Sequence, residues 1–583
     1  MQDQELQSLC EAVSQSELMG HLAELARWVK LSGTPEELES LRYVRGRLDG
    51  YGYRTKLLLH DAYISLPGRA QVEAGGRALR CITHSFSRSS APDGIRAPLV
   101  DVGAATEQDL AGRDVAGRIL LIDGMASPGA SLRATLAGAA GQLHISPHEH
   151  LHEMCISPVW GSPTHETEAR LPQTVVCTIP REDGIALRDR LARGEALEAM
   201  MQAEVDTGWR QTPILVAEMA GPGAADSENF VMFSGHHDTW YYGVMDNGGA
   251  NTTMLEVARL CASRRDEWRR GLRILFWSGH SHGRYSGSTW YADNHWEELD
   301  RGCVGHVNVD STGAKGNTVL GDVPMAAELR GLARDAVMRQ AGQEVTGQRM
   351  SRAGDESFWG IGIPAMFMSL GQQPAGTGTD VAASVIGRGG GHKRLGAGLG
   401  WWWHTPDDTL DKMDPDILVR DTRVYVHTVW RMLTDAVLPL DYEEHAAYLL
   451  ETLAELGQGL DGRFDLAPVV SRAETLRSRA QALRERGAQE DGGGAARINH
   501  ALMAVSRALV PMDYTNGDRF DHDPALAQDA YPALQPLRRL AALPADSDEA
   551  RFLAVGMIRA RNRVCHALDL ATGAMERCLA ELS

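Results

Sequence analysis

The chain has 583 residues and a formal net charge of −19. This length is too great for one ordinary hydrophobic core, so we expect about two to four domains. The negative charge argues against a general affinity for nucleic acid or for an anionic membrane surface. A hydrophobic fraction of 43% with 23% charged residues is typical of a soluble globular protein.

Signals for export, membrane insertion and disulfide formation are not apparent. Residues 1–5 lack the basic region and apolar core of a secretory signal, and no run of about 18 apolar residues predicts a membrane span. The eight cysteines form no CxxC pair, which favours reduced thiols over a disulfide framework. We therefore expect a cytoplasmic protein with no membrane partner.

The sequence pattern of the first 205 residues changes near residue 60. Leu18, Leu22 and Leu25 recur at helical spacing, and residues 53–59 have the pattern of a strand. Between 61 and 205, short apolar runs such as 98–102 and 118–122 alternate with Gly, Pro and Asp turns. This pattern predicts a separate β-rich region.

Residues 206–440 alternate between strand and helix patterns. The short apolar runs 230–233, 272–277 and 304–309 need cover on both faces, and helical stretches such as 251–261 lie between them. Buried strands that alternate with helices predict an α/β fold with a mostly parallel sheet. Ligands collect at the carboxyl ends of such strands, where His236, His280 and Asp310 stand.

The last third of the chain contains a glycine-rich loop and then helices. Residues 371–400 predict a long loop that ends at Trp401-Trp402-Trp403 and serves as a wall or lid of a site. Residues 441–583 are rich in Ala, Leu, Glu and Arg, with helical stretches at 443–456, 473–486, 495–509 and 550–582. We expect a helical C-terminal domain there.

Histidines and aspartates with the character of metal ligands follow the predicted strands. His236 and Asp238 stand two residues apart, Asp246 precedes a helix, Asp310 ends a third strand, and His404 follows the long loop. Zinc takes imidazole nitrogen and carboxylate oxygen, and one carboxylate can bridge two ions. One such residue alone is more often a cap or turn residue, but several in this order predict a divalent metal site.

These residues resemble the M28 family of zinc exopeptidases, in particular its larger members related to glutamate carboxypeptidase II and the transferrin receptor. The resemblance implies that His236, Asp246 and Asp310 bind a first metal and that Asp246 and His404 contribute to a second. It implies a supporting role for Asp238. The implied metal is zinc, as one or two ions.

The domain order also resembles that of the larger family members. It implies an M28-like metallohydrolase domain at 1–60 and 206–440 and an inserted domain at 61–205 that is similar to a protease-associated domain. The helices of 441–583 resemble the family's dimerisation domain, which implies a homodimer. Gly354-Asp355-Glu356-Ser357-Phe358 resembles the family's substrate-pocket segment.

One motif departs from the family. Where the family has a Glu-Glu pair, of which the first is the general base and the second a metal ligand, this chain reads Gly279-His280-Ser281-His282-Gly283. The match places His280 at the base position and Ser281 at the ligand position, whereas a one-residue slip places Ser281 and His282 there. Serine is a poor neutral ligand, so the second metal position loses an anionic oxygen.

Three consequences of this replacement stay open at the level of sequence. One metal could remain on His236, Asp246 and Asp310. His280 or His282 could ligate instead, in a nitrogen-rich site that suits zinc, iron, manganese, cobalt or nickel. A neutral imidazole at 280 or 282 could also act as general base, because its ordinary pKa of about 6.5 suits proton transfer near neutrality.

The leading functional hypothesis is a metal-dependent hydrolase that cleaves an amide or related C–N bond of a small, amino-acid-like or peptide-like substrate. A metal-dependent lyase on the same scaffold is the first alternative, because the glutamate base is lost. A non-catalytic binding or scaffold protein is the second.

Some residues have a second, structural interpretation. Arg284, Arg352 and Arg388 are candidates for binding an acidic group, although each is more often a surface ion-pair partner. Asp407 and Asp408 are expected to cap the following helix. The inserted-domain histidines at 144, 148, 150 and 152 are interpreted as a polar loop that could reach over the cleft rather than as another metal site.

Overall fold

The structure is a computed structural model that describes residues 2–222, 228–367, 369–379, 381–385, 393–490 and 492–583. Its central strands are β9 (Phe230–His236), β10 (Gly271–Trp277) and β11 (Cys303–Asn308). β9 lies between the other two and is parallel to both. The predicted mostly parallel sheet is therefore confirmed, and β12 (Ala365–Met366) extends it beyond β11.

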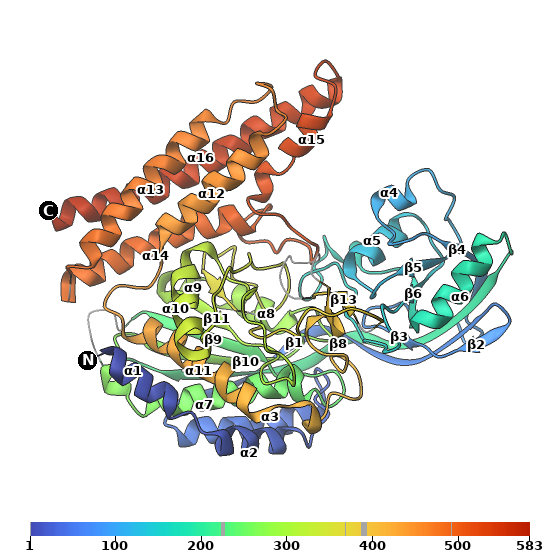
Figure 1. The fold of residues 1–583 in the computed structure, drawn as a ribbon, viewed down its shortest axis with the longest axis horizontal. Helices are drawn as coiled ribbons and strands as arrows, with labels where there is room; N and C mark the ends of the chain where they lie inside the picture. The colour runs from blue at the N-terminus through green and yellow to red at the C-terminus, as the bar shows by residue number, and fades with distance from the viewer. Residues whose placement is uncertain (1, 223–227, 368, 380, 386–392, 491) are drawn as a thin grey trace.

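Alternation along β9 explains why helices cover both faces of the sheet. Val231 and Phe233 pack in the core that includes α7 (Ala250–Ala262) and α11 (Pro415–Thr434), whereas Met232 packs with α8 (Ser286–Asn294) and α9 (Trp296–Gly302). Every residue of β9 is buried, as expected of a central parallel strand. The N-terminal helices α1 (Gln2–Glu11), α2 (Gln15–Leu25) and α3 (Pro35–Gly50) lie beside α7 and α11 (Figure 1).

Two long antiparallel strands lead from this core into residues 61–205. β1 (Arg54–Ala74) and β8 (Glu198–Met219) pair from Arg54 with Glu218 to Ala74 with Ala199. β8 pairs with β10 at one end and with β4 (Ile95–Asp101) at the other, so the sheet continues through both regions. In Figure 1 these strands run to the right into the second region.

The second region has its own hydrophobic core. β5 (Ile119–Asp123), β6 (Gly141–Ile145) and β7 (Val175–Ile179) are parallel neighbours and bury a separate cluster that includes Leu121, Leu143 and Val175. Its likeness to a protease-associated domain stays a prediction. The remaining elements here are α4 (Glu107–Leu110), α5 (Pro128–Leu136), α6 (Arg181–Ala192), β2 (Arg77–Leu79) and β3 (Ile82–Thr83).

The C-terminal region is helical, as predicted. It contains α12 (Tyr442–Gly457), α13 (Ala467–Gly487), α14 (Gly492–Tyr514), α15 (Leu537–Ala542) and α16 (Asp548–Leu582), and α10 (Arg330–Ala341) of the α/β region lies below them in Figure 1. Dimerisation through these helices stays a prediction. No helix among the described residues is both long and apolar enough to span a membrane.

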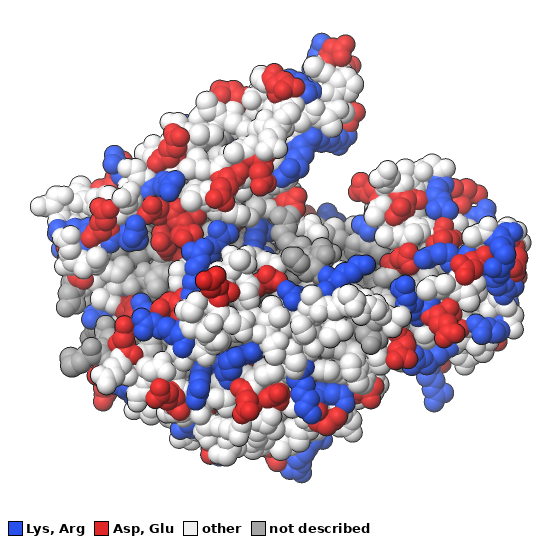
Figure 2. Space-filling model, in the orientation of Figure 1, with Lys and Arg blue, Asp and Glu red and all other residues white. Residues whose placement is uncertain are grey.

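Acidic and basic side chains are interspersed over the face shown in Figure 2, which is hollowed between the C-terminal helices and the 61–205 region. The loops that follow β9, β10 and β11 carry the candidate site residues. The short hairpin of β13 (Val381–Ala383) and β14 (Lys393–Leu395) belongs to the glycine-rich loop. Gly389-Gly390-Gly391 and Arg388 lie outside the described residues.

Candidate metal centre

His236 is the last residue of β9 and faces two carboxylates. Its Nδ1–H donates to the Asp238 carbonyl at 2.8 Å. This hydrogen bond turns Nε2 toward the two carboxylates, and Nε2 lies 3.1 Å from Asp246 Oδ1 and 3.5 Å from Asp310 Oδ1. The three predicted ligands of the first metal are thus brought together, and Nδ1 of His236 has the hydrogen-bond acceptor that a metal-binding imidazole needs.

Asp246 stands between two imidazoles. Its second oxygen, Oδ2, lies 3.1 Å from Nε2 of His404. The backbone N–H groups of Met245 and Asp246 donate to the Asp408 carboxylate at 2.9 and 3.0 Å, which anchors the segment. The expectation that Asp408 caps a helix is wrong, because its carboxylate is buried against Asp246. Burial raises the pKa of Asp408 to about 7.

The β-rich region positions His404. Nδ1–H of His404 donates to the Glu153 carbonyl at 2.6 Å, and the Glu153 N–H donates to the His404 carbonyl at 3.1 Å. The Trp403 ring stacks on the His404 ring with centroids 3.6 Å apart. The predicted second-metal ligand is therefore held by a residue 251 positions earlier in the chain.

A pair of buried histidines extends this support. The His150 N–H donates to Nδ1 of His148, so His148 carries its proton on Nε2, which lies 3.2 Å from Nε2 of His152. Nδ1–H of His152 in turn donates to the Trp403 carbonyl, next to His404. Of the polar loop expected from the sequence, His148 and His152 do reach the site and form a hydrogen-bond relay, whereas His144 lies in strand β6. The closely spaced histidines of the sequence indicated this loop. They did not predict that His152 binds the Trp403 carbonyl.

The segment that replaces the glutamate pair is held by Asp238. One oxygen of this buried carboxylate accepts the His280 N–H at 3.3 Å, and the other accepts the Ser281 N–H at 2.9 Å and the Ser32 hydroxyl at 2.6 Å. Asp238 therefore supports the site through the backbone of 280–281, not through a hydrogen bond of its carboxylate to His236.

His280 joins the ligand cluster. A nitrogen of its ring and ligand atoms of His236 and Asp310 all lie within 4.8 Å of one another. Its Nδ1–H donates to Asp355 Oδ2 at 2.9 Å, and Ser288 donates to the other oxygen of Asp355. Burial alone would raise the pKa of Asp355, but the interaction with His280 holds it below its ordinary value. Nε2 of His280 is left for the site.

His282 points elsewhere. Its Nδ1 lies 3.0 Å from Ser32 Oγ, and its ring packs on Trp240 with centroids 4.3 Å apart. Burial lowers the pKa of His282 to about 3, so this imidazole is neutral near pH 7. Of the two histidines that the sequence left as alternatives, His280 is the one beside His236 and Asp310.

The donor set fits a divalent cation. His236 Nε2 and Asp246 Oδ1 are buried and face each other at 3.1 Å, and neither has a hydrogen bond to any other described residue, as expected of atoms that share an ion. Burial opposes a charge on His236, but Asp310 and Asp246 raise its pKa well above the usual value. Imidazole nitrogens with carboxylate oxygens are the ligands that zinc prefers.

These residues open into a cavity of ≈ 430 Å³. Its walls come from every part of the site: the loops after β9–β11, residues 125–128 and 154–155 of the β-rich region, and residues 383–385 and 399 of the glycine-rich loop. A substrate bound here would contact all three. Trp403 lines the cavity, whereas Trp401 and Trp402 do not.

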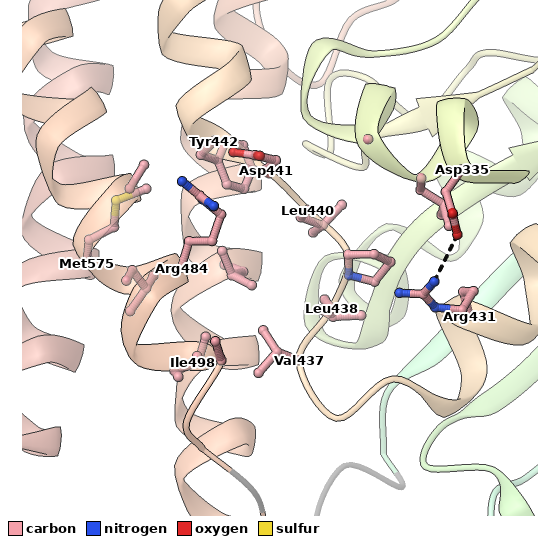
Figure 3. Close-up of a pocket in the computed structure, with 18 of the residues that line it drawn as sticks. Asp335, Arg431, Val437, Leu438, Leu440, Asp441, Tyr442, Arg484, Ile498 and Met575 are labelled. Carbon is pink, nitrogen blue, oxygen red and sulfur yellow. Dashed lines mark hydrogen bonds and ion pairs between the residues drawn. The ribbon is translucent and has the colours of Figure 1, made fainter. Parts of the chain in front are cut away.

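A second cavity, of ≈ 640 Å³, lies between α10, α11 and the C-terminal helices (Figure 3). It contains the Asp335–Arg431 ion pair and aliphatic side chains such as Leu438 and Ile498. Within the described part of the chain, the only group of at least three candidate metal ligands is the one at His236. The candidate metal ligands therefore belong to the smaller cavity.

Comparison with known proteins agrees with this geometry. Residues 215–429 match the model of "Peptidase family M28". This part of the chain is similar to peptidase family M28. It contains every candidate ligand named above, so the resemblance that those residues carry is confirmed.

Individual relatives are more distant. A "Probable glutamate carboxypeptidase VP8" of Zea mays is 27% identical over 40% of this chain, and "Aminopeptidase NAALADL1" of Rattus norvegicus is 23% identical over 49%. The chain spans only 32% and 42% of these two relatives. The structure of an aminopeptidase from Aneurinibacillus sp. strain AM-1 superposes with a TM-score of 0.55 at 20% identity, over 73% of this chain and 95% of that one.

Removal of a first-metal ligand should abolish tight metal binding. We expect His236→Ala to weaken zinc binding by more than the roughly 10- to 100-fold that loss of an outer partner costs. Isothermal titration of the metal-stripped protein with zinc measures this, and His500→Ala, on the exposed face of α14, is the matched control. Equal affinity in wild type and His236→Ala would remove His236 from the site.

The histidine relay should matter through His404. His152→Phe removes the hydrogen bond to Trp403, and we expect zinc binding at the His404 position to weaken roughly 10- to 100-fold. His150→Phe is the control, because His150 stacks on Trp401 with centroids 4.3 Å apart and a phenyl ring keeps that contact. The same zinc titration measures the affinity of both variants. Equal losses of zinc affinity in the two would contradict the relay.

Proposed function

We propose that this protein is a metal-dependent hydrolase that cleaves an amide or peptide C–N bond of a small, peptide-like substrate. The observation that carries the proposal is the convergence of His236, Asp246, Asp310 and His404 at one end of a cavity, where Asp246 lies 3.1 Å from an imidazole nitrogen on either side. The relatives' names, a glutamate carboxypeptidase and an aminopeptidase, support an exopeptidase-like reaction.

We assign His280 as the proton acceptor rather than as a ligand of the first ion. Its ring stacks on that of His236 with centroids 3.7 Å apart and planes 13° apart. An imidazole directs its lone pair in the plane of its ring, so two stacked, nearly parallel rings do not aim at a single ion. The distances within the cluster permit ligation by His280, but the orientation of the rings favours the base.

Asp355 prepares His280 for this role. The carboxylate accepts the Nδ1–H at 2.9 Å, so the neutral imidazole keeps its lone pair on Nε2. When His280 takes a proton from the attacking water, Asp355 stabilises the imidazolium that forms. A divalent ion at the neighbouring ligands would supply Lewis acidity for the attacked carbonyl.

The second metal position has fewer anionic ligands in this chain than in the family pattern. Asp246 Oδ2 and His404 Nε2 remain, but Ser281 replaces the anionic ligand that the family pattern places there. The Ser281 hydroxyl is buried without a hydrogen-bond partner among the described residues and is neutral. We infer that one ion binds tightly and that a second binds less tightly between Asp246 and His404.

The function can be tested with zinc-loaded full-length protein and a panel of aminoacyl amides, acyl-amino acids and dipeptides, with release of the amine as the readout. Turnover that depends on zinc and is lost in His236→Ala supports the proposal. Zinc-loaded protein that turns over none of the panel overturns it and favours a non-hydrolytic role.

Replacement of the base should separate chemistry from metal binding. We expect His280→Ala to lower kcat roughly 10²- to 10⁴-fold, the usual worth of a general base, while zinc content stays that of wild type. Asp355→Asn should act in the same direction, and Asp546→Asn, at an exposed position, should change nothing. A loss of zinc from His280→Ala would show that His280 is a ligand.

The pH profile gives a second readout of the base. A carboxyl has an ordinary pKa of about 4.3 and an imidazole of about 6.5. The base must be unprotonated, so activity rises with pH through its pKa. In His280→Glu we therefore expect the ascending limb of kcat against pH to move to lower pH. An unmoved limb would assign it to another group.

A further inference from the structure

Trp160 of the β-rich region contacts the groups that support the proposed base. The residue is 3% exposed, and it is not among the described residues that line the catalytic cavity. Its indole Nε1–H donates to the Ser357 hydroxyl at 2.9 Å. Ser357 stands two residues after Asp355, the carboxylate that binds His280. A side chain from residues 61–205 therefore reaches the support of the base without lining the cavity.

A chain of buried hydroxyl groups joins Trp160 to the Asp355 carboxylate. Ser357 Oγ lies 2.9 Å from Ser288 Oγ, and Ser288 donates to Asp355 Oδ1 at 2.9 Å. The other oxygen of Asp355 accepts the Nδ1–H of His280 at 2.9 Å. Successive hydrogen bonds thus connect the indole of Trp160 with the imidazole of His280.

The indole fixes the direction of this chain. A tryptophan Nε1–H can only donate, and a serine hydroxyl has one proton to give. Because Ser288 gives its proton to Asp355, the Ser357 hydroxyl donates to Ser288 and accepts from Trp160. Hydrogen bonds that follow one another in this way polarise and strengthen each other. The chain therefore ends on the carboxylate and holds one of its oxygens, while the other oxygen holds His280.

The Trp160 ring also supports His280 through Tyr285. The centroids of the Trp160 and Tyr285 rings lie 4.4 Å apart, and the Tyr285 ring meets the His280 ring edge-on at 4.9 Å. The guanidinium carbon of Arg352 lies 4.1 Å from the Trp160 ring centroid. Arg352 is buried and donates to two backbone carbonyls of the C-terminal region. All three regions of the chain therefore meet at Trp160.

The segment that carries Trp160 is fitted closely to α8. Gly161 has a left-handed φ of 72°, and a Cβ at this position would lie 2.7 Å from the Thr289 side chain. Its N–H donates to the Arg284 carbonyl at 2.7 Å. Only glycine fits here without a shift of its neighbours, which is typical of a segment that is held in one position.

We propose that Trp160 is a positioning residue for His280. It acts through the two serine hydroxyls, which orient Asp355 and thereby the Nδ1–H of His280, so that Nε2 can take the proton of the attacking water. The proposal rests on the proposed hydrolase function and deepens it. It gives the β-rich region a part in proton transfer that is separate from its hold on His404.

Loss of the indole N–H should lower turnover without weakening substrate or metal binding. Trp160→Phe keeps an aromatic ring but removes the donor. In zinc-loaded, full-length protein we expect kcat on a substrate of the panel above to fall roughly 2- to 10-fold, the worth of one hydrogen bond, with KM and zinc content unchanged. Trp268→Phe is the matched control, because Trp268 is similarly buried but its Nε1 has no partner among the described residues.

A double variant distinguishes positioning from a general structural role. If Trp160 acts through His280, Trp160→Phe should lower kcat no further in a His280→Ala background. An equal loss in both backgrounds would show that Trp160 acts independently of the base and would overturn the proposal.

A second variant interrupts the same chain at its next member. Ser357→Ala removes the donor to Ser288, so it should lower kcat at least as much as Trp160→Phe. The two substitutions together should lose no more than Ser357→Ala alone, because both break one chain. Losses that multiply would contradict the chain.

A spectroscopic readout separates this inference from the hydrolase function. The Nδ1–H of His280 donates to a carboxylate, so we expect its proton at low field in the NMR spectrum, identified by its loss in His280→Ala. Trp160→Phe should shift this resonance, and Trp268→Phe should not. An unmoved resonance in folded, zinc-loaded Trp160→Phe overturns the positioning role and leaves the hydrolase proposal standing. A shifted resonance in a protein that hydrolyses none of the panel supports the positioning role and overturns the hydrolase.

Discussion

The site depends on one repeated interaction, a hydrogen bond from Nδ1 of an imidazole that leaves Nε2 facing the cluster. In His236 the acceptor is the Asp238 carbonyl, in His404 the Glu153 carbonyl, and in His280 the Asp355 carboxylate. Two acceptors are neutral carbonyls and one is a charged carboxylate. The charged carboxylate stabilises an imidazolium more strongly than a carbonyl does, which suits the proposed role of His280 as the group that gains a proton.

The fold supplies these acceptors from distant parts of the chain. The parallel strands β9 and β11 bring His236 and Asp310 to one edge of the sheet. The long pair β1 and β8 carries the β-rich region outward, and its residues 148–155 return to hold His404. The β-rich region is therefore part of the site, since it both positions a candidate ligand and lines the cavity.

Much of the fold could be predicted from the sequence, because it depends on local patterns. The buried runs at 230–233, 272–277 and 304–309 became β9, β10 and β11, and the four C-terminal stretches became α12, α13, α14 and α16. Strand ends placed His236 and Asp310 together. The roles of Asp408 and Asp355, and the path from His152 to Trp403, could not be predicted, because contacts between distant segments leave no periodic signal.

The choice between His280 and His282 shows the same limit. The motif alone allowed either histidine to take the place of the lost glutamate base, since a one-residue slip exchanges them. Asp238 fixes the backbone of this segment by accepting hydrogen bonds from the N–H groups of His280 and Ser281. Ser32 and Trp240 contact the ring of His282. The contacts of the two histidines in the structure therefore distinguish them, whereas the spacing of the motif does not.

The central proposal is that His236, Asp246 and Asp310 hold a metal ion and that His280 beside them is the base. A crystal structure of the zinc-loaded protein, with anomalous data collected at the zinc absorption edge, tests this most directly. The account predicts a strong peak within bonding distance of His236, Asp246 and Asp310, with His280 hydrogen-bonded to Asp355 and outside the coordination shell. A peak coordinated by Nε2 of His280, or no peak at these residues, would contradict it.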